Sequence, residues 1–177
     1  TQSDPEPVQK PKLFVLIVVD QFRYDYLTRY RTEYKGGLNR LINQGALFTD
    51  AHLQHFPTVT AIGHGVLLTG AMPAQSGIIG NDWYDRDEGK QVGCVADPAA
   101  TMVGGSGGAG ASPHRLLVST VGDELKAKTG GKARVFGISI KDRAAVLPAG
   151  HAADAAFWYE TKTGSFVSST CYLSDLP

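Results

Sequence analysis

Asp20 and Thr60 are two side chains whose types and positions suit chemistry, Asp20 as a ligand of a metal ion and Thr60 as a hydroxyl at the start of a helix. Asp20 follows the apolar run of residues 13–19, and a carboxylate at the carboxyl end of a buried strand suits a divalent cation. Thr60 lies in FPTVTAIGH, residues 56–64, at the predicted start of a helix. Free backbone N–H groups and the helix dipole favour an alkoxide or a bound anion there. Taken singly, each residue also fits a structural role as a cap.

Three further residues are candidates to hold the oxygens of an anionic group. Lys141 and Arg143 follow a predicted strand that ends at Ile140, where two cations can clamp a phosphoryl group. Asn81, in GIIGNDWYD, can donate an amide hydrogen bond to the same group, although asparagine after glycine is also a common turn residue. A solvated charged turn is the alternative for residues 141–143. The expected placement of these residues at one site is stronger evidence for anion binding than any one of them alone.

The histidines and cysteines are weaker candidates. His52 and His55 are three residues apart in an extended stretch, so their side chains should point to opposite faces and not form a metal pair. His64, one turn after Thr60, is expected to be a hydrogen-bonded packing residue. The two cysteines, Cys94 and Cys171, form no Cys-x-x-Cys pair. In an oxidising compartment these two would be able to form a single disulfide.

A glycine-rich stretch at residues 105–110 formally matches the dinucleotide-binding fingerprint. The fingerprint must follow a strand directly, and the preceding residues 96–102 contain a proline and no β-branched run. A flexible surface loop is therefore the better prediction. A noncatalytic nucleotide- or phosphate-binding module remains an alternative function.

Alternating strands and helices are predicted to position these residues. The unalternating apolar run 13–19 predicts a central parallel strand covered on both faces. A helix around residues 38–42 that stops at Gly45, and a strand at 46–49, follow. Further elements are a helix over 60–69, a helix from Ser112-Pro113 to Gly130, a strand over 133–140 and a hairpin of residues 157–159 and 166–171 around Gly164. This order predicts an α/β fold with ligands at the carboxyl ends of the strands.

Length and composition narrow the class of protein. The chain has 177 residues, 42% of them hydrophobic, enough for about one globular domain. The formal net charge is zero, so no whole-chain basic field attracts nucleic acid. The longest apolar run is far shorter than the roughly 20 residues of a membrane-spanning helix. Residues 1–11, with three prolines and no aromatic residue, are interpreted as a flexible leader without a signal-peptide core.

Five ordered blocks resemble the alkaline phosphatase superfamily, and in particular its threonine-nucleophile alkaline phosphatases, which are related to the nucleotide pyrophosphatase/phosphodiesterases. The blocks are VVDQ ending in Asp20-Gln, FPTVTAIGH around Thr60, LTG, GIIGNDWY around Asn81 and IKDR with Lys141 and Arg143. The resemblance implies a three-layer α/β sandwich with a mostly parallel central sheet. It covers the chain from about Lys12 to the end.

The resemblance also implies a reaction. Asp20 and Thr60 would contact one of two zinc ions, Thr60 would be the nucleophile that becomes phosphothreonine, and Asn81, Lys141 and Arg143 would hold the phosphoryl oxygens. Small phosphate esters would be the substrates. The diesterase relatives typically lack the Lys-x-Arg pair, so we rank phosphate monoesters above the alternative of a phosphodiesterase or nucleotide pyrophosphatase. Cys94-Val-Ala-Asp-Pro98 lacks the arginine of the arylsulfatase motif, which disfavours that branch.

This chain is far shorter than the members of the family. The family supplies its remaining zinc ligands from the second half of a far longer chain, so residues 12–177 are expected to be the N-terminal part of a catalytic domain. The other metal ligands are expected beyond residue 177, and activity is expected to need the full-length chain. The resemblance and the leader together predict a periplasmic or secreted protein whose signal peptide has been removed.

Overall fold

The computed structural model describes residues 11–177, so the predicted leader lies almost entirely outside the described residues. Over these residues the chain forms two compact units, residues 11–51 and 52–177.

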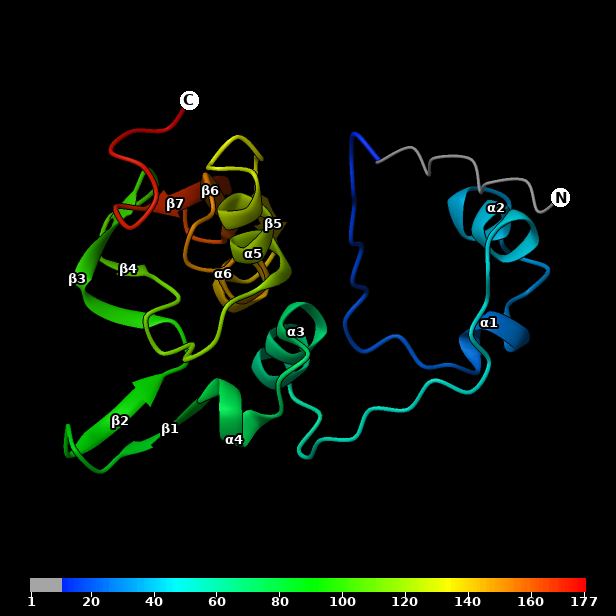
Figure 1. Cartoon of the computed structure of the whole chain (residues 1–177), viewed down its shortest axis with the longest axis horizontal. Helices are drawn as coiled ribbons and strands as arrows, with labels where there is room; N and C mark the ends of the chain where they lie inside the picture. The colour runs from blue at the N-terminus through cyan, green and yellow to red at the C-terminus, as the bar shows by residue number, and fades with distance from the viewer. Residues whose placement is uncertain (1–10) are drawn as a thin grey trace, which may run out of the picture. The chain divides into compact units, whose positions relative to one another are not determined.

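The N-terminal unit contains two short helices, α1 (Tyr26–Arg29) and α2 (Gly37–Gln44) (Figure 1). The guanidinium of Arg31 links the connecting segment to α2, since its Nη1 donates to Asn39 Oδ1 at 2.9 Å. The Tyr34 hydroxyl donates to the carbonyl of Tyr26 at 2.7 Å. The predicted helix around residues 38–42 and its end at Gly45 are confirmed.

The two strands predicted in this unit do not form. Residues 13–19 and 46–49 have no strand assignment, and the apolar side chains of the first run are exposed, from 36% for Val18 to 78% for Leu13. A strand requires a partner for its backbone N–H and C=O groups, and neither of the described sheets includes these residues. The prediction of a central strand at 13–19 is therefore wrong for this structure, because an apolar run does not by itself specify a neighbouring strand to pair with.

The C-terminal unit is built on a five-stranded sheet in the order β4-β3-β7-β6-β5. Its strands are β3 (Ala96–Val103), β4 (Ala109–Ala111), β5 (Phe136–Ser139), β6 (Ala155–Glu160) and β7 (Ser165–Ser169). The pair β5–β6 is parallel, and the other pairs are antiparallel. The sheet is thus mixed rather than mostly parallel over the described residues. The predicted hairpin around Gly164 is confirmed, with β6 and β7 as its strands.

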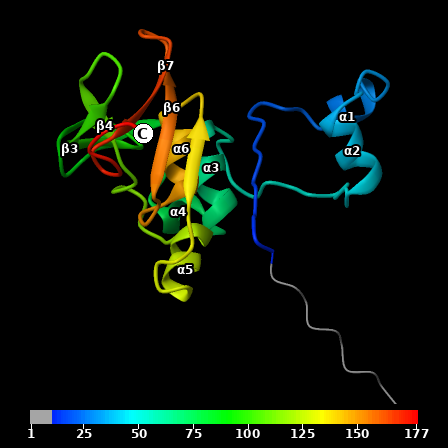
Figure 2. The ribbon, with the colours of Figure 1, turned by 90° about the horizontal axis from the view of Figure 1, so that it is seen from above.

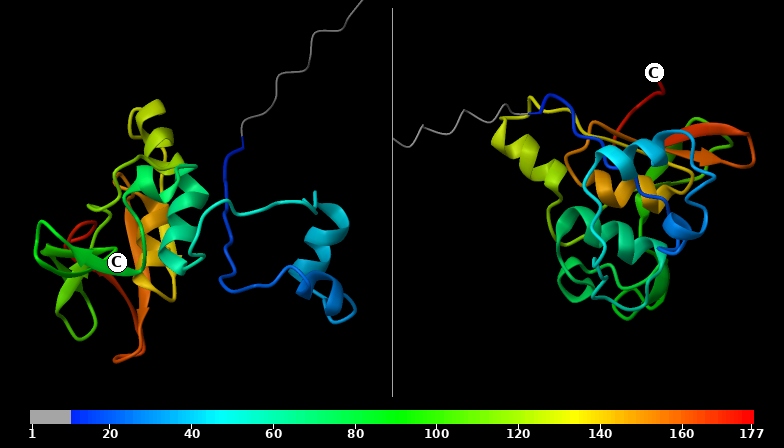
Figure 3. Two further views of the ribbon diagram at one scale, coloured as in Figure 1. Left: turned by 90° about the horizontal axis from the view of Figure 1, so that it is seen from below. Right: turned by 90° about the vertical axis from the view of Figure 1, so that its right-hand side faces the viewer.

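Helices α3 (Thr60–Thr69) and α6 (Asp142–Ala149) lie on the same side of β6 and β7 (Figures 2 and 3). The core joins fully buried side chains of α6, such as Val146 and Leu147, to Ala61 of α3 and Val167 of β7. Gly137 allows β5 to approach α6 closely, since a Cβ there would lie 2.2 Å from a backbone carbonyl oxygen of the helix. This packing fixes the start of α6 beside the end of β5.

Between α3 and β3, the chain forms the short helix α4 (Pro73–Ser76) and the two-stranded hairpin β1 (Asp82–Asp85) and β2 (Lys90–Gly93). The hairpin is antiparallel and pairs Asp82 with Gly93 at its base. None of these three elements was predicted from the sequence.

The glycine-rich stretch and the following helix differ from prediction. Residues 104–108 connect β3 and β4, which pair antiparallel, so the segment turns between strands and does not lead into a helix. It is not a dinucleotide fingerprint, although β3 is a strand despite Pro98. The predicted helix at Ser112 begins only at α5 (Val121–Lys128), after the N-cap Thr120. The Ser112 hydroxyl instead donates to Asp97 Oδ2 at 2.5 Å.

Within residues 11–177, no helix combines the length and apolar character that crossing a membrane requires.

Candidate active site

The N-terminus of α3 brings Thr60 and Asn81 together. Thr60 is the first residue of the helix, and the N-cap residue, Val59, provides no side-chain cap. The backbone N–H of Ala61 instead donates to Asn81 Oδ1 at 2.9 Å. This bond uses the acceptor oxygen of the amide, and the carboxamide also carries two N–H donors. The structure therefore places a polar donor group beside the half-buried Thr60.

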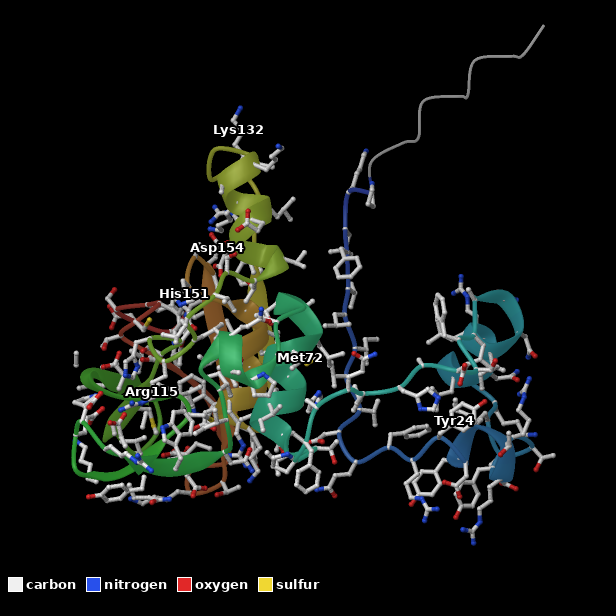
Figure 4. The ribbon with its side chains drawn as sticks, turned by 60° about the horizontal axis from the view of Figure 1, so that its bottom comes forward. Tyr24, Met72, Arg115, Lys132, His151 and Asp154 are labelled. Carbon is white, nitrogen blue, oxygen red and sulfur yellow. The ribbon has the colours of Figure 1, made fainter. Side chains whose placement is uncertain are left out.

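The β1–β2 hairpin fixes the position of Asn81. The backbone N–H of Cys94 donates to the Asn81 carbonyl at 2.9 Å and closes the base of the hairpin. Arg115, labelled in Figure 4, holds the hairpin from outside: its Nη1 lies 3.1 Å from Asp85 Oδ2, and its Nη2 bonds Glu88. The side chain of Arg115 is only 10% exposed. The β1–β2 hairpin, which Arg115 stabilises, therefore fixes the position of Asn81 at the start of α3.

Lys141 and Arg143 lie at the start of α6, immediately after β5, where the sequence predicted them. Lys141 is the N-cap residue and Arg143 belongs to the first turn. Arg143 and Asn81 line one cavity of about 220 Å³, with Asp142 and Cys94 also in its wall; the other lining residues are Gly93, Val95, Ala96, Ala109 and Gly110. Lys141 is exposed and is not among these lining residues.

Of the five predicted site residues, the C-terminal unit therefore connects three: Thr60, Asn81 and Arg143. Asp20 belongs to the other compact unit, so its predicted partnership with Thr60 stays a prediction.

The Arg143 guanidinium has unused hydrogen-bonding capacity. Its Nε is buried and has no hydrogen-bond partner among the described residues. Its Nη1 lies 3.8 Å from Asp142 Oδ1, and the side chain is 28% exposed. A buried cationic donor without a partner is rare in folded proteins.

Cys94 contributes a neutral thiol to the cavity wall. Burial, reinforced by the negative charge of Asp142, raises the pKa of Cys94 to about 12. A thiolate is the reactive form of cysteine, so this residue is not a nucleophile at neutral pH. Cys94 is buried, Cys171 is exposed, and both are free. The disulfide that the sequence allowed between them is therefore not formed in this structure.

Three of the five histidines occupy different environments. His64 is 6% exposed and its Nδ1 lies 2.8 Å from the Thr60 carbonyl, so its predicted packing role is confirmed. His151 (Figure 4) lies between Asp123 Oδ2 at 3.3 Å and the Leu116 carbonyl at 2.9 Å. His55 is 8% exposed, and neither ring nitrogen has a hydrogen-bond partner in the described residues.

Two cavity residues, Asp142 and Cys94, were not recognised as site residues from the sequence. Asp142 stands between two cations in Lys141-Asp-Arg143, and that pattern is a usable signal. No sequence pattern indicated Cys94, because this residue lies next to Asn81 only once the β1–β2 hairpin has formed.

Comparison with known families defines the class of protein. A family model described as type I phosphodiesterase / nucleotide pyrophosphatase matches residues 14–173. The chain belongs to this family.

Individual relatives narrow the class further. The chain is 48% identical to alkaline phosphatase PhoV of Synechococcus elongatus over 98% of its own length and 32% of PhoV. It is 47% identical to a protein named calcium-transporting ATPase from Myroides odoratus, over 97% of this chain and 32% of that protein. It is 46% identical to alkaline phosphatase PafA of Elizabethkingia meningoseptica, over 96% of this chain and 32% of PafA. The chain thus spans about a third of the length of these relatives.

The fold agrees with these relationships. A crystal structure of PafA superposes with a TM-score of 0.86 at 44% identity, over 90% of this chain and 31% of that chain. The predicted α/β, alkaline-phosphatase-like fold is confirmed.

Proposed function

We propose that the intact protein hydrolyses phosphate monoesters and that Thr60 is its nucleophile. Relatives named alkaline phosphatase support phosphate-ester hydrolysis as the general chemistry. The observation that carries the finer assignment is the bond from Ala61 N–H to Asn81 Oδ1, together with the cavity that Asn81 shares with Arg143. These contacts link the start of α3 to Asn81, and Asn81 to the cavity that Arg143 also lines.

A second solved structure supports the same set of residues. It is a PafA variant in which a threonine is replaced by serine, and an asparagine, a lysine and an arginine are replaced by alanine; it superposes with a TM-score of 0.87 at 43% identity, over 90% of this chain and 32% of that chain. The same four residue types occur in the same order here as Thr60, Asn81, Lys141 and Arg143.

The proposed cofactor is a pair of zinc ions. Asp20 and Thr60 would supply two oxygen ligands, and oxygen donors suit zinc. Within residues 11–177, no group of three or more His, Cys, Asp or Glu side chains lies close enough to hold a metal. Since catalytic zinc takes about three protein ligands, the described residues fit only part of the site. When bound, the ions would stabilise the alkoxide form of Thr60 and the departing ester oxygen.

The chain's own residues would carry the remaining work. Thr60 Oγ1 forms a bond to phosphorus while the ester oxygen leaves from the opposite side and takes up the proton lost by the threonine. Water then attacks the phosphothreonine, which restores the hydroxyl and releases inorganic phosphate. Asn81 and Arg143 would donate to the non-bridging oxygens, and Lys141 would add a second positive charge.

The number of charges favours monoesters over diesters. A monoester carries two negative charges on the transferred group, whereas a diester carries one and blocks one oxygen with a second substituent. Two cations at residues 141 and 143 therefore favour the monoester more strongly. Rates on 4-nitrophenyl phosphate and bis(4-nitrophenyl) phosphate separate the two functions, and faster turnover of the diester would replace this proposal by a phosphodiesterase.

The relatives named alkaline phosphatase are bacterial proteins, and we propose a periplasmic or secreted location for this one. Cell fractionation with the assay above tests the location, since activity confined to the cytoplasm would contradict it.

The decisive test uses the intact protein with 4-nitrophenyl phosphate. We expect hydrolysis that EDTA abolishes and zinc restores. Thr60→Ala should lower kcat by several orders of magnitude, whereas Thr58→Ala, at an exposed threonine two residues earlier, should leave it near wild type. Wild-type kcat in Thr60→Ala would overturn the nucleophile assignment.

A further inference from the structure

Asp142 is an acidic residue in the wall of a cavity that otherwise suits an anion. It is the first residue of α6 and stands between Lys141 and Arg143. Its Oδ1 accepts the backbone N–H of Arg143 at 2.7 Å. Asp142 also lines the cavity shared by Asn81 and Arg143, and its side chain is 41% exposed.

The side chains of Asp142 and Arg143 interact through their opposite charges, without a hydrogen bond between them. Their closest side-chain atoms, Oδ1 and Nη1, are 3.8 Å apart, which is beyond hydrogen-bond distance. The carboxylate leaves the buried Nε of Arg143 without a partner. Asp142 therefore does not fix the guanidinium in the way that a bidentate pair would.

The negative charge of Asp142 also acts within the cavity. Together with burial, which is the larger cause, it raises the pKa of the Cys94 thiol in the cavity wall. An anion beside Arg143 would experience the same repulsion.

We propose that Asp142 is a specificity-determining residue that weakens the binding of phosphate dianions and so promotes release of inorganic phosphate. This inference rests on the proposed function. Substrate and product of monoester hydrolysis both carry a dianionic phosphoryl group, so two uncompensated cations would hold the product as firmly as the substrate. Uniform binding of this kind does not accelerate the chemical step. With Asp142 present, residues 141–143 carry a net charge of one instead of two.

The size of the effect follows from the geometry. An oxygen bonded to Arg143 Nη1 lies up to about 6.6 Å from the carboxylate when a bond of about 2.8 Å is added to the observed separation of 3.8 Å. Because both side chains are partly exposed, a dielectric constant close to that of water applies. Removing the charge should then tighten binding about threefold for a monoanion and about eightfold for a dianion.

Asp142→Asn is the matched test, because asparagine keeps an oxygen that accepts the Arg143 N–H. In the intact protein, inorganic phosphate at alkaline pH should inhibit hydrolysis of 4-nitrophenyl phosphate with a Ki about eightfold lower than in wild type. Bis(4-nitrophenyl) phosphate, a monoanion, should gain only about threefold. Both gains should shrink in high salt, a response that a purely structural change would not give.

Asp142→Glu retains the charge and should resemble wild type. The control Asp87→Asn removes an equal charge from the exposed turn of the β1–β2 hairpin and should leave both inhibition constants unchanged. An unchanged or raised phosphate Ki in Asp142→Asn would overturn the inference while the proposed function stands. An equal increase in affinity for the monoanion and the dianion would also overturn the inference.

Calorimetric titration with inorganic phosphate separates the two proposals. If wild-type protein lacks phosphatase activity, the proposed function fails, but the comparison of phosphate affinity between wild type and Asp142→Asn still decides the role of Asp142. Absence of any phosphate binding by both proteins overturns the inference as well.

Discussion

Asn81 caps α3 and is proposed to bind the phosphoryl group, and two substitutions at this position distinguish the two roles. Its Oδ1 caps α3 through the Ala61 N–H at 2.9 Å, and its amide N–H groups are proposed to hold a phosphoryl oxygen. Asn81→Ala removes both. Loss of a helix cap costs about 1 kcal/mol of unfolding free energy. Loss of a hydrogen bond to a charged group costs about 1.5–3 kcal/mol, which corresponds to roughly a ten- to 150-fold fall in kcat/KM.

Asn81→Asp removes only the donor. Its carboxylate still accepts the Ala61 N–H and lies near the positive end of the helix dipole, so the unfolding free energy should match or exceed that of wild type. Activity should fall at least as far as in Asn81→Ala, because the new negative charge repels an anionic ester.

Urea denaturation and steady-state kinetics on the intact protein measure the two effects. Gln91→Ala, at an exposed amide of strand β2, is the matched control and should retain kcat/KM. Full activity in Asn81→Asp would refute the proposed donor role, and equal destabilisation by both substitutions would refute the capping role.

Three further outcomes follow from the structure. Because Cys94 is buried with a pKa raised to about 12, a thiol reagent should label Cys171 rapidly and Cys94 only after unfolding; no labelling in denaturant would instead reveal a disulfide. Burial alone would raise the pKa of Asp154, but the backbone N–H of Val135 and two neighbouring cations lower it well below its usual range. Its stabilising contribution is therefore complete above about pH 4 and is lost as pH falls toward the folded-state pKa, so Asp154→Asn should flatten the acid limb of a stability–pH curve, and an unchanged limb would contradict this. Gly137→Ala forces a Cβ to within 2.2 Å of a carbonyl oxygen of α6 and should cost several kcal/mol, on the order of 3; an unaltered melting curve would contradict that contact.

Local sequence signals predicted the elements whose formation depends on near neighbours. The helix over 60–69 coincides with α3, and the β6–β7 hairpin forms around Gly164, whose φ of 73° suits glycine. In each case the stop signals and the apolar pattern lie within a few residues. Elements whose formation depends on distant partners were predicted less well.

Pro98 illustrates one failure. Proline lacks a backbone N–H, which argued against a strand at 96–102. The register between β3 and β4 shifts between Ala96 and Thr101, and proline is tolerated at such an irregularity. The late start of α5 is another: Ser112 can cap a helix, but its hydroxyl is used by Asp97 fifteen residues earlier.

In the candidate site, too, local sequence predicted the residues but not the contacts between distant parts of the chain. Residue type and order in the sequence identified Thr60, Asn81, Lys141 and Arg143 as candidates. The contacts that join three of them, namely the bond between α3 and Asn81 and the shared cavity, depend on the β1–β2 hairpin and on the packing of α6. Neither leaves a local pattern in the sequence, and the same holds for the placement of Cys94 beside Asn81.

In the proposed reaction, the side chain of residue 60 becomes phosphorylated during turnover. Mass spectrometry detects this phosphate in peptides from intact protein that is quenched in acid during hydrolysis of an aryl phosphate. We expect one phosphate on Thr60, and none in Thr60→Ala. Phosphate on a different residue, or steady hydrolysis in Thr60→Ala at the wild-type rate, would contradict it.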